Sequence, residues 1–315
     1  MKATFLLVLE ALLAAGMVSV AGAQSPEVTH NTWTSGTPLP VAVFQPTAAV
    51  LKAEIYVIAG NSNSGTVADV QIYNPATDTW STGVSYPAAV ASPTAAVVKN
   101  ILYVFGGTTD NGESATNDVW AYNPKTKTWT VMASMPTARF NAQAVVEKNI
   151  IYVIGGSANA SGNGNLATVE AYDPATNTWT EEAPMLVAKS GSAAGLIGTT
   201  IVVADGGTNG GGSTGDTEGY DAATNTWKSL TSDSASRYNP CNGAIGPKLF
   251  AAGGQLGGSF TDDFQLSKDK WTTLASLPQS TMFPASAVYK GQLYCFGGWG
   301  ANGGPIINNV QIYQP

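Results

Sequence analysis

Short apolar runs alternate with glycine-rich and polar turns along the chain, and this pattern of hydrophobic and polar positions recurs. Runs this short, rich in valine, isoleucine and aromatic residues, are typical of β-strands rather than helices. Five of them close on a pair of glycines and a sixth on Ala59-Gly60; the five pairs are Gly106-Gly107, Gly155-Gly156, Gly206-Gly207, Gly253-Gly254 and Gly297-Gly298. The recurrence predicts a chain built from repeated β units.

A tryptophan marks each repeat at a nearly constant interval. Six tryptophans are separated by 47, 49, 50, 48 and 44 residues, and a period in this range indicates a solenoid, a propeller or another repeat array. A tyrosine or phenylalanine precedes five of the six by seven positions. The six are Trp33, Trp80, Trp129, Trp179, Trp227 and Trp271.

One unit, residues 140–183, shows how the pattern divides into strands. Residues 141–147 and 150–154 are apolar runs, residues 168–172 alternate in polarity, and residues 178–181 follow a turn rich in Asp, Pro and Asn. We name these strands a, b, c and d in chain order. Four short strands per unit, repeated radially, form a propeller. The sequence therefore predicts an all-β, six-bladed β-propeller with four antiparallel strands per blade.

The two ends of the chain carry complementary parts of one repeat. Residues 310–315 are a strand c that stops inside its turn, and residues 30–33 supply the second half of such a turn and the start of strand d. We expect the N-terminal strand to pair with the C-terminal blade, which removes a free sheet edge. Deletion of residues 24–38 is then expected to open the ring.

The residues of the repeat resemble the Kelch motif. The resemblance rests on Gly155-Gly156, Tyr172 with Asp173-Pro174, and Asn177-Thr178-Trp179, and it recurs six times. Departures are Ala59 in place of a glycine, Phe264 in place of a tyrosine, and an irregular turn at residues 267–270. The resemblance implies the Kelch propeller fold, but motif residues that build blades indicate little about function.

Charge and the N-terminus limit the possible locations and partners. The net charge of −7 disfavours nucleic acid and anionic membranes as partners. Lys2, the apolar residues 5–20 and Ala21-Gly22-Ala23 form a signal-peptide pattern. We expect cleavage after Ala23, a single propeller domain over residues 24–315, and a secreted or periplasmic protein without membrane insertion after cleavage. A retained N-terminal anchor is the alternative.

The scarcity of histidine and cysteine excludes several chemistries. His30 is the single histidine, so a Ser-His-Asp or Cys-His mechanism and metal or haem sites built on histidine are not expected. Galactose oxidase shares the Kelch propeller and uses histidines at copper, so that activity does not carry over. We expect no cofactor and no metal. Cys241 and Cys295 fall in adjacent blades, and both a disulfide and two buried thiols are open.

The long loops predict which face binds a ligand. In an antiparallel blade, the d–a and b–c loops emerge on one face, and the a–b and c–d turns emerge on the other. The b–c loops are long and rich in Gly, Ser and Asn, whereas the a–b turns, such as Lys148-Asn149 and Lys290-Gly291, are short. Variable loops on a rigid scaffold commonly carry function. We expect ligands at the face of the d–a and b–c loops.

Basic and aromatic residues cluster in the d–a loops. Arg139, Lys189 and Arg237 occupy one repeat position in three consecutive blades, where the other repeats have Val43, Val90 and Met282. Either these cations bind a carboxylate or another anion, or each pairs locally with an acid or a ring and serves the scaffold. The aromatic residues expected beside them are Phe44, Phe140, Tyr238, Phe283 and, from a b–c loop, Trp299.

Asp205 is the remaining anomaly. It precedes Gly206-Gly207, and we align it with Ile58, Phe105, Ile154, Ala252 and Phe296, which end the second strand of the other repeats. A carboxylate in such a buried place has to be hydrogen-bonded or paired. It is either a satisfied buried acid or a channel-facing general base.

These observations support three functions. The first is an exported binding module that presents its loops to a glycan, peptide or protein. The second is a metal-independent sugar mutarotase or epimerase, resembling the bacterial Kelch-type sialic acid mutarotases, in which the basic residues would hold a carboxylated sugar and Asp205 would transfer protons. The third is a structural envelope protein. The ligand itself is not specified by the sequence.

Overall fold

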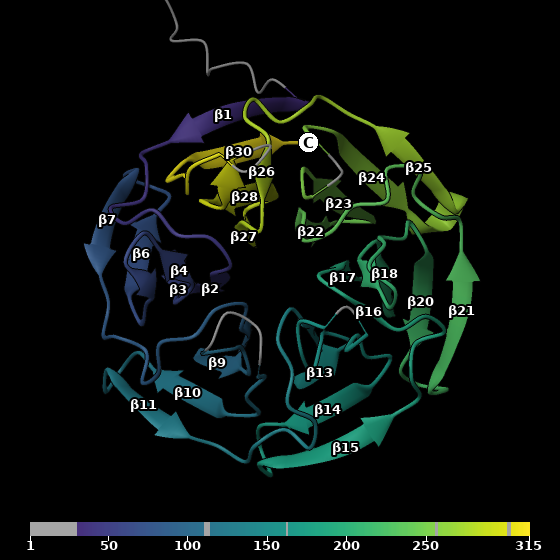
Figure 1. Cartoon of the computed structure of the whole chain (residues 1–315), viewed down its shortest axis with the longest axis horizontal. Helices are drawn as coiled ribbons and strands as arrows, with labels where there is room; N and C mark the ends of the chain where they lie inside the picture. Colours follow the sequence, from purple (N-terminus) through teal and green to yellow (C-terminus); the bar gives the residue numbers. More distant parts are fainter. Residues whose placement is uncertain (1–29, 110–113, 162, 256–257, 301–303) are drawn as a thin grey trace, which may run out of the picture.

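The chain folds into a ring of six blades around a central axis (Figure 1). The computed structural model describes residues 30–315 except 110–113, 162, 256–257 and 301–303. The expected signal peptide, residues 1–23, lies outside the described residues. Each blade is a four-stranded antiparallel sheet, so the predicted all-β, six-bladed propeller is confirmed.

The first three blades follow one another along the chain, and each contains strands a to d in order from the axis outward. They comprise β2 (Thr47–Leu51), β3 (Glu54–Ile58), β6 (Val70–Asn74) and β7 (Thr79–Thr82); β8 (Thr94–Val98), β9 (Ile101–Phe105), β10 (Val119–Asn123) and β11 (Thr128–Val131); and β12 (Gln143–Glu147), β13 (Ile150–Ile154), β14 (Val169–Asp173) and β15 (Thr178–Glu182).

Blades four and five repeat this arrangement, and blade six is assembled from both ends of the chain. They comprise β17 (Ala193–Ile197), β18 (Thr200–Ala204), β20 (Thr217–Asp221) and β21 (Thr226–Leu230); β22 (Cys241–Ile245), β23 (Lys248–Ala252), β24 (Thr261–Gln265) and β25 (Lys270–Thr273); and β27 (Ala285–Tyr289), β28 (Gln292–Phe296), β30 (Val310–Gln314) and β1 (Thr32–Gly36).

Short elements fill the connections between the blade strands. In the described parts of the chain, the one helix is the three-residue η1 (Leu266–Lys268) at the irregular turn of blade five. No helix among those residues is both long and apolar enough to span a bilayer. The two-residue strands are β4 (Asn61–Ser62), β5 (Gly65–Thr66), β16 (Lys189–Ser190), β19 (Gly207–Thr208), β26 (Thr281–Met282) and β29 (Trp299–Gly300).

The N-terminal strand closes the ring as predicted. β1 pairs antiparallel with β30, with Trp33 opposite Tyr313. The Tyr313 hydroxyl donates to the Asn31 side chain at 2.8 Å, and the Trp33 indole donates to the Ala275 carbonyl of blade five at 2.9 Å. Both chain ends are thus held in one sheet, and β30 is paired on both sides, with β28 and β1, instead of forming a free edge.

The motif residues pack the blades against one another. In blade three the Tyr172 hydroxyl donates to Asn177 at 2.6 Å, and the Trp179 ring lies 4.9 Å from the Tyr172 ring. The Trp179 indole nitrogen reaches across to the Ala133 carbonyl of the preceding blade at 2.9 Å. The motif therefore serves blade cores and blade-to-blade contacts, as its resemblance implies.

A ring of backbone hydrogen bonds encircles the axis where strand a of each blade begins. One residue per blade donates its N–H to the carbonyl of its counterpart in the neighbouring blade, at 2.7–3.2 Å. All six have a left-handed backbone, with φ between 50° and 58°. The ring residues are Gln45, Ser92, Asn141, Gly191, Asn239 and Phe283. This ring fixes the relative positions of the six d–a loops.

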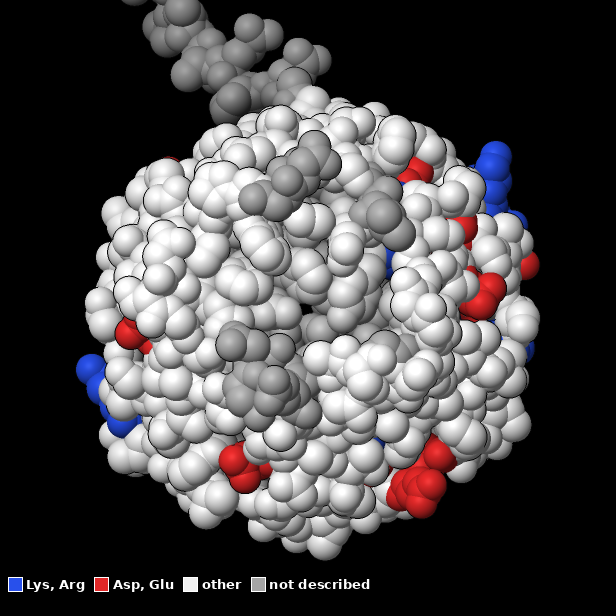
Figure 2. Space-filling view, in the orientation of Figure 1, with Lys and Arg blue, Asp and Glu red and all other residues white. Residues whose placement is uncertain are grey.

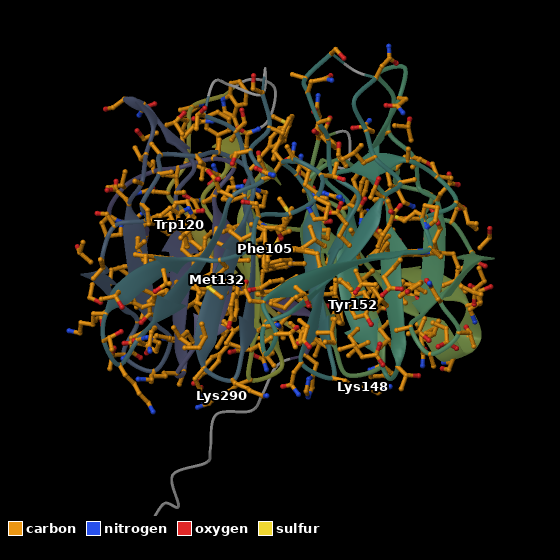
Figure 3. All side chains as sticks on the ribbon, turned by 90° about the horizontal axis from the view of Figure 1, so that it is seen from below. Phe105, Trp120, Met132, Lys148, Tyr152 and Lys290 are labelled. Carbon is orange, nitrogen blue, oxygen red and sulfur yellow. A yellow bond between two sulfur atoms is a disulfide. The ribbon has the colours of Figure 1, made fainter. Side chains whose placement is uncertain are left out.

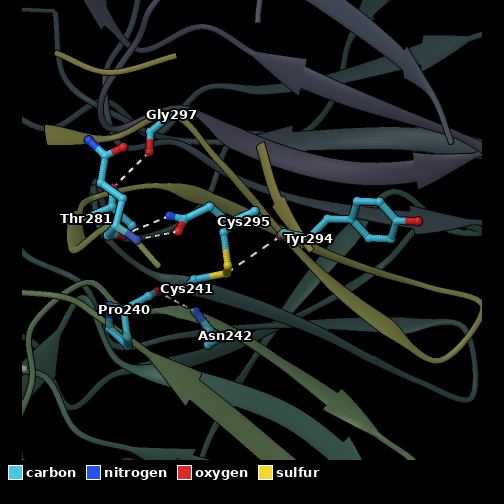
Figure 4. The surroundings of a disulfide bond; sticks show 9 residues. Pro240, Cys241, Asn242, Thr281, Tyr294, Cys295 and Gly297 are labelled. Carbon is cyan, nitrogen blue, oxygen red and sulfur yellow. Dashed lines mark hydrogen bonds between the residues drawn. A yellow bond between two sulfur atoms is a disulfide. The ribbon is translucent and has the colours of Figure 1, made fainter. Parts of the chain in front are cut away.

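A disulfide links blade five to the closing blade. Cys241 on β22 and Cys295 on β28 are joined, with their Cα atoms 5.7 Å apart (Figure 4). Both residues are buried. Of the two alternatives that the sequence left open, the structure has the disulfide. It spans the junction next to the blade that both ends of the chain complete, so it reinforces the closure covalently.

Candidate binding site at the propeller mouth

The d–a and b–c loops lie on one face and surround a pocket at the axis. We call this pocket the mouth pocket; its volume is about 330 Å³. Figure 2 shows this face, hollowed at the centre, with most of the charged residues toward its perimeter. Lys148 and Lys290, in the a–b turns, lie at the opposite edge of the molecule (Figure 3). The division of loops between faces is as strand direction predicts.

Three of the predicted aromatic residues line the mouth pocket, namely Phe140, Tyr238 and Phe283. The other two, Phe44 and Trp299, are not among its lining residues. Instead their rings pack together 5.2 Å apart, with Trp299 37% exposed. The five predicted aromatics therefore form two groups, one in the pocket and one beside it.

Tyr238 is held in a fixed position across blade four. A Cβ atom on Gly191 would lie 2.6 Å from its ring, and one on Gly207 would lie 3.1 Å from it. Its hydroxyl accepts a hydrogen bond from the Asn141 amide at 2.9 Å, and its ring meets Phe283 edge-on at 5.5 Å. Gly191 and Gly207, which have no side chains, thus provide the space that the Tyr238 ring occupies.

The three predicted cations lie beneath this surface. The side chains of Arg139, Lys189 and Arg237 are at most 1% exposed. None is among the residues that line the mouth pocket. Each pairs with an acid on strand c of its own blade. The structure therefore favours the second interpretation of these residues, local pairing that serves the scaffold.

Each cation also donates to at least one backbone carbonyl. Arg139 lies 2.9 Å from Glu170 and donates to the carbonyls of Gly155 and Thr168 at 2.9 and 3.0 Å. Lys189 lies 3.0 Å from Glu218 and donates to the Asp216 carbonyl at 2.9 Å. These bonds tie each d–a loop to its own blade.

Arg237 lies between two carboxylates. It pairs with Asp262 and lies 3.3 Å from Asp233. Burial raises the pKa of Asp233, and the Arg237 charge opposes that rise. A buried cation with two acidic partners is unavailable to a ligand, because any ligand would have to displace them.

The acidic partners were missed in the sequence, although a signal was present. Glu170, Glu218 and Asp262 occupy the second position of strand c, and this position is acidic in the three blades that have a cation in the d–a loop. In blades one and six the same position is Gln71 and Gln311. Covariation among the six repeats therefore indicated an internal ion pair.

Asp205 occupies a different place from the one the sequence alignment assigned. It follows the last residue of β18, Ala204, so it corresponds to the first residue of the glycine pair in other blades. Its φ of 60° matches the 59–66° of the residues at that place, which are Ala59, Gly106, Gly155, Gly253 and Gly297. The three-residue run Asp205-Gly206-Gly207 shifted the alignment by one position.

The Asp205 carboxyl is buried and only partly bonded. One oxygen accepts from the Arg237 backbone N–H at 3.4 Å, and the other has no hydrogen-bond partner in the described part of the chain. Burial, reinforced by the Asp233 charge, raises the pKa of Asp205 to about 8. It lines neither the mouth pocket nor the channel of about 230 Å³ on the far side of the backbone ring, so the structure favours a buried acid over a channel-facing general base.

The d–a loop of blade six is also shifted by one residue relative to the sequence alignment. Phe283 is the ring residue, because its N–H donates to the Asn239 carbonyl. The alignment of Met282 with Arg139 would instead put Pro284 in the ring. Thr281 consequently occupies the place of the three cations. The shift puts the Phe283 side chain on the axis, where it lines both the mouth pocket and the channel beyond the ring.

The mouth pocket is uncharged in its described lining. Asn, Gln, Ser, Thr and small residues accompany the three aromatics, and no Asp, Glu, Lys, Arg or His is among them. The channel on the far side of the backbone ring, about 230 Å³, is lined in the same manner. Across the described residues there is also no group of three or more His, Cys, Asp or Glu residues that could hold a metal ion.

Comparison with known proteins identifies the repeat. The chain matches the KLHDC2/KLHL20/DRC7 Kelch-repeats domain over residues 24–134 and 92–298. No curated protein sequence matches it significantly. The solved structure described as "Structure of YjhT" superposes with a TM-score of 0.76 and 20% sequence identity, covering 88% of this chain and 96% of that one. At this identity the likeness extends to the fold alone.

Proposed function

This chain belongs to the Kelch-repeat family, and we propose that it is a binding module whose ligand site is the mouth pocket. One observation carries the proposal: a concave site lined by three aromatic side chains and several amides lies where the long loops meet the axis. Concave sites that combine aromatic surface with a few polar groups are the usual places for ligands.

The scaffold beneath the pocket supports the proposal. The backbone ring and the three buried ion pairs fix the d–a loops, which supply Phe140, Tyr238 and Phe283. A preorganised site loses little conformational entropy when a ligand binds. Rigid support under variable loops is the arrangement expected for recognition.

We place this binding module outside the cytoplasm, secreted or periplasmic, after cleavage behind Ala23. The signal-peptide pattern of residues 1–23 motivates this location. The Cys241–Cys295 disulfide supports it, because structural disulfides persist mainly in oxidising compartments. N-terminal sequencing of protein collected from a secreting host should give Gln24 as the first residue; an intact Met1 would overturn the location.

The observations favour binding over sugar mutarotation. A mutarotase that holds a carboxylated sugar needs a cation and a proton-transfer group at the pocket. Arg139, Lys189 and Arg237 are instead buried in ion pairs, and Asp205 lies outside the pocket. Within the described lining, Tyr238 is the one ionisable side chain, and burial raises its pKa. A purely structural envelope role predicts no ligand at all.

The experiment compares the two faces of the ring. Wild type, Tyr238→Ala/Phe283→Ala and Lys148→Ala/Lys290→Ala are screened against a glycan array and a displayed library of random peptides. The proposal predicts binding that the mouth variant loses and the opposite-face variant keeps. Binding that survives in the mouth variant, or no binding by folded wild type, contradicts it.

A further inference from the structure

The chemistry of the mouth pocket selects among the ligand classes. From its geometry we propose that the pocket binds an uncharged sugar ring, either a free glycoside or the end of a neutral glycan. This inference rests on the function proposed above and narrows it. It replaces the acidic sugar expected from the sequence with a neutral one.

The absence of charge in the described lining argues against an anionic ligand. A carboxylate that entered would lose its hydration without meeting a cation, which is strongly unfavourable. The nearest candidates, Arg139, Lys189 and Arg237, are already neutralised by Glu170, Glu218 and Asp262. A peptide terminus meets the same penalty, since it also carries a charge. A hydroxyl-rich, neutral ligand does not.

The aromatic pair supplies the surface on which a sugar ring packs. Tyr238 and Phe283 meet at right angles, with ring centroids 5.5 Å apart, and Tyr238 is immobilised against Gly191 and Gly207. Immobilised rings offer apolar area at little entropic cost. The C–H face of a pyranose is apolar enough to cover such a ring, and its hydroxyls remain at the edge.

Amide groups around the rings match those hydroxyls. Asn141 uses its side-chain nitrogen to bond Tyr238, and Gln45 uses its side-chain oxygen to accept from Asn61. Among the described residues, no hydrogen bond occupies the Asn141 side-chain oxygen or the Gln45 side-chain nitrogen. One acceptor and one donor therefore remain on two residues that line the pocket, a set that suits a hydroxyl, which both donates and accepts.

The backbone of Phe283 gives an independent indication of function. Phe283 has a φ of 58°, a left-handed conformation that is unfavourable for an aromatic residue. Three of the five equivalent residues, Asn141, Gly191 and Asn239, are types that adopt it readily, and the other two are Gln45 and Ser92. Strain of this kind persists mainly at functional sites. Here it places an aromatic ring on the axis, where an asparagine would satisfy the fold better.

Calorimetric titration of the purified protein tests the inference with matched probes. Methyl glucoside, methyl galactoside and methyl mannoside are each compared with the corresponding uronide, which differs only in a carboxylate at C6. We expect at least one neutral glycoside to bind at least about tenfold more tightly than its uronide, a difference equal to about 1.4 kcal/mol. Equal or tighter binding of every uronide overturns the inference.

Two variants locate the sugar. Phe283→Asn should raise the melting temperature, because strain is relieved, and weaken sugar binding at least about tenfold. Tyr289→Ala, a tyrosine on the opposite face, should leave affinity unchanged. Unchanged affinity in Phe283→Asn overturns the inference. If only peptides from the displayed library bind at the mouth, the sugar assignment fails and the binding module stands; if no probe responds to mouth variants, both fail.

Discussion

Blades three to five and blades one and six anchor the same loop by different chemistry. In blade three, the second residue of strand c is Glu170, which pairs with Arg139 across 2.9 Å. In blade six it is Gln311, whose amide bonds both the N–H and the carbonyl of Gln279, each at 2.9 Å. One loop is held by a buried ion pair and the other by a neutral amide.

The contrast shows that the contact between strand c and the d–a loop, which we call the anchor, does not require charge. Gln71 of blade one repeats the amide solution, accepting from the Val41 N–H at 2.8 Å and donating to its carbonyl at 3.1 Å. A buried ion pair and an uncharged substitute often have similar net stability, because desolvation offsets the attraction between the charges. The cations thus belong to one of two arrangements that hold the d–a loops in place. Their presence needs no anionic ligand as an explanation.

The largest effect is expected from breaking one ion pair on one side only. Arg139→Met leaves Glu170 buried without its partner, and loss of one member of such a pair destabilises by about 3–5 kcal/mol. Denaturant unfolding of wild type and variant measures the difference. A loss below about 1 kcal/mol would mean that the Glu170 site is hydrated in solution, contrary to its burial.

Removal of the Gln311 amide should destabilise the protein less than Arg139→Met does. Gln311→Leu leaves the Gln279 backbone groups unpaired but leaves no buried charge without a partner. We therefore expect the free energy of unfolding to fall by about 1–3 kcal/mol. The same unfolding experiment applies. A larger loss than that of Arg139→Met would reverse the ranking of the two anchors.

The Asp205 carboxyl, near the blade-five ion pair, should make the free energy of unfolding depend on pH. Its folded pKa of about 8 lies above the ordinary value of 3.8, so the folded protein binds the proton more tightly than the unfolded chain. Stability from this group therefore falls as pH rises from about 4 to about 8 and stays level above that. Asp205→Asn should remove the fall.

Unfolding at several pH values measures that effect. The variant's advantage over wild type should widen from pH 4 to pH 8, by several kcal/mol at about 1.4 kcal/mol for each unit of pKa shift, and then remain constant. An advantage that does not change with pH would show that the carboxyl is already ionised at pH 4.

The smallest effect is expected from exchanging one anchor for the other. Arg139→Val/Glu170→Gln gives blade three the residues of blade one, Val43 and Gln71. We expect stability within about 1 kcal/mol of wild type, well above Arg139→Met alone. If the double variant is as unstable as the single one, the two anchors are not equivalent.

The fold was predictable from the sequence to an unusual degree because the repeat is regular. Tryptophan spacing predicted six blades, and the split repeat at the two ends predicted the pairing of β1 with β30. Glycine runs were less informative. Asp205-Gly206-Gly207 contains two possible glycine pairs, and only the backbone φ values distinguish them.

The candidate site was harder to predict, because its residues lie in loops. Period-two patterning tells which way a strand residue points, but no such rule applies to Arg139 or Arg237 in a d–a loop. Their burial followed from acids on strand c, a relation visible only when the repeats are compared with one another. Phe140, Tyr238 and Phe283 line the mouth pocket, since they flank or occupy the ring positions.

We propose that the cations hold the scaffold while the aromatic residues hold the ligand. The most direct test titrates the methyl glycoside that binds wild type best into Arg139→Val/Glu170→Gln and into Tyr238→Ala. We expect the first variant to keep the wild-type affinity within about twofold and the second to lose at least about tenfold. Loss of sugar binding by a folded Arg139→Val/Glu170→Gln protein would contradict it.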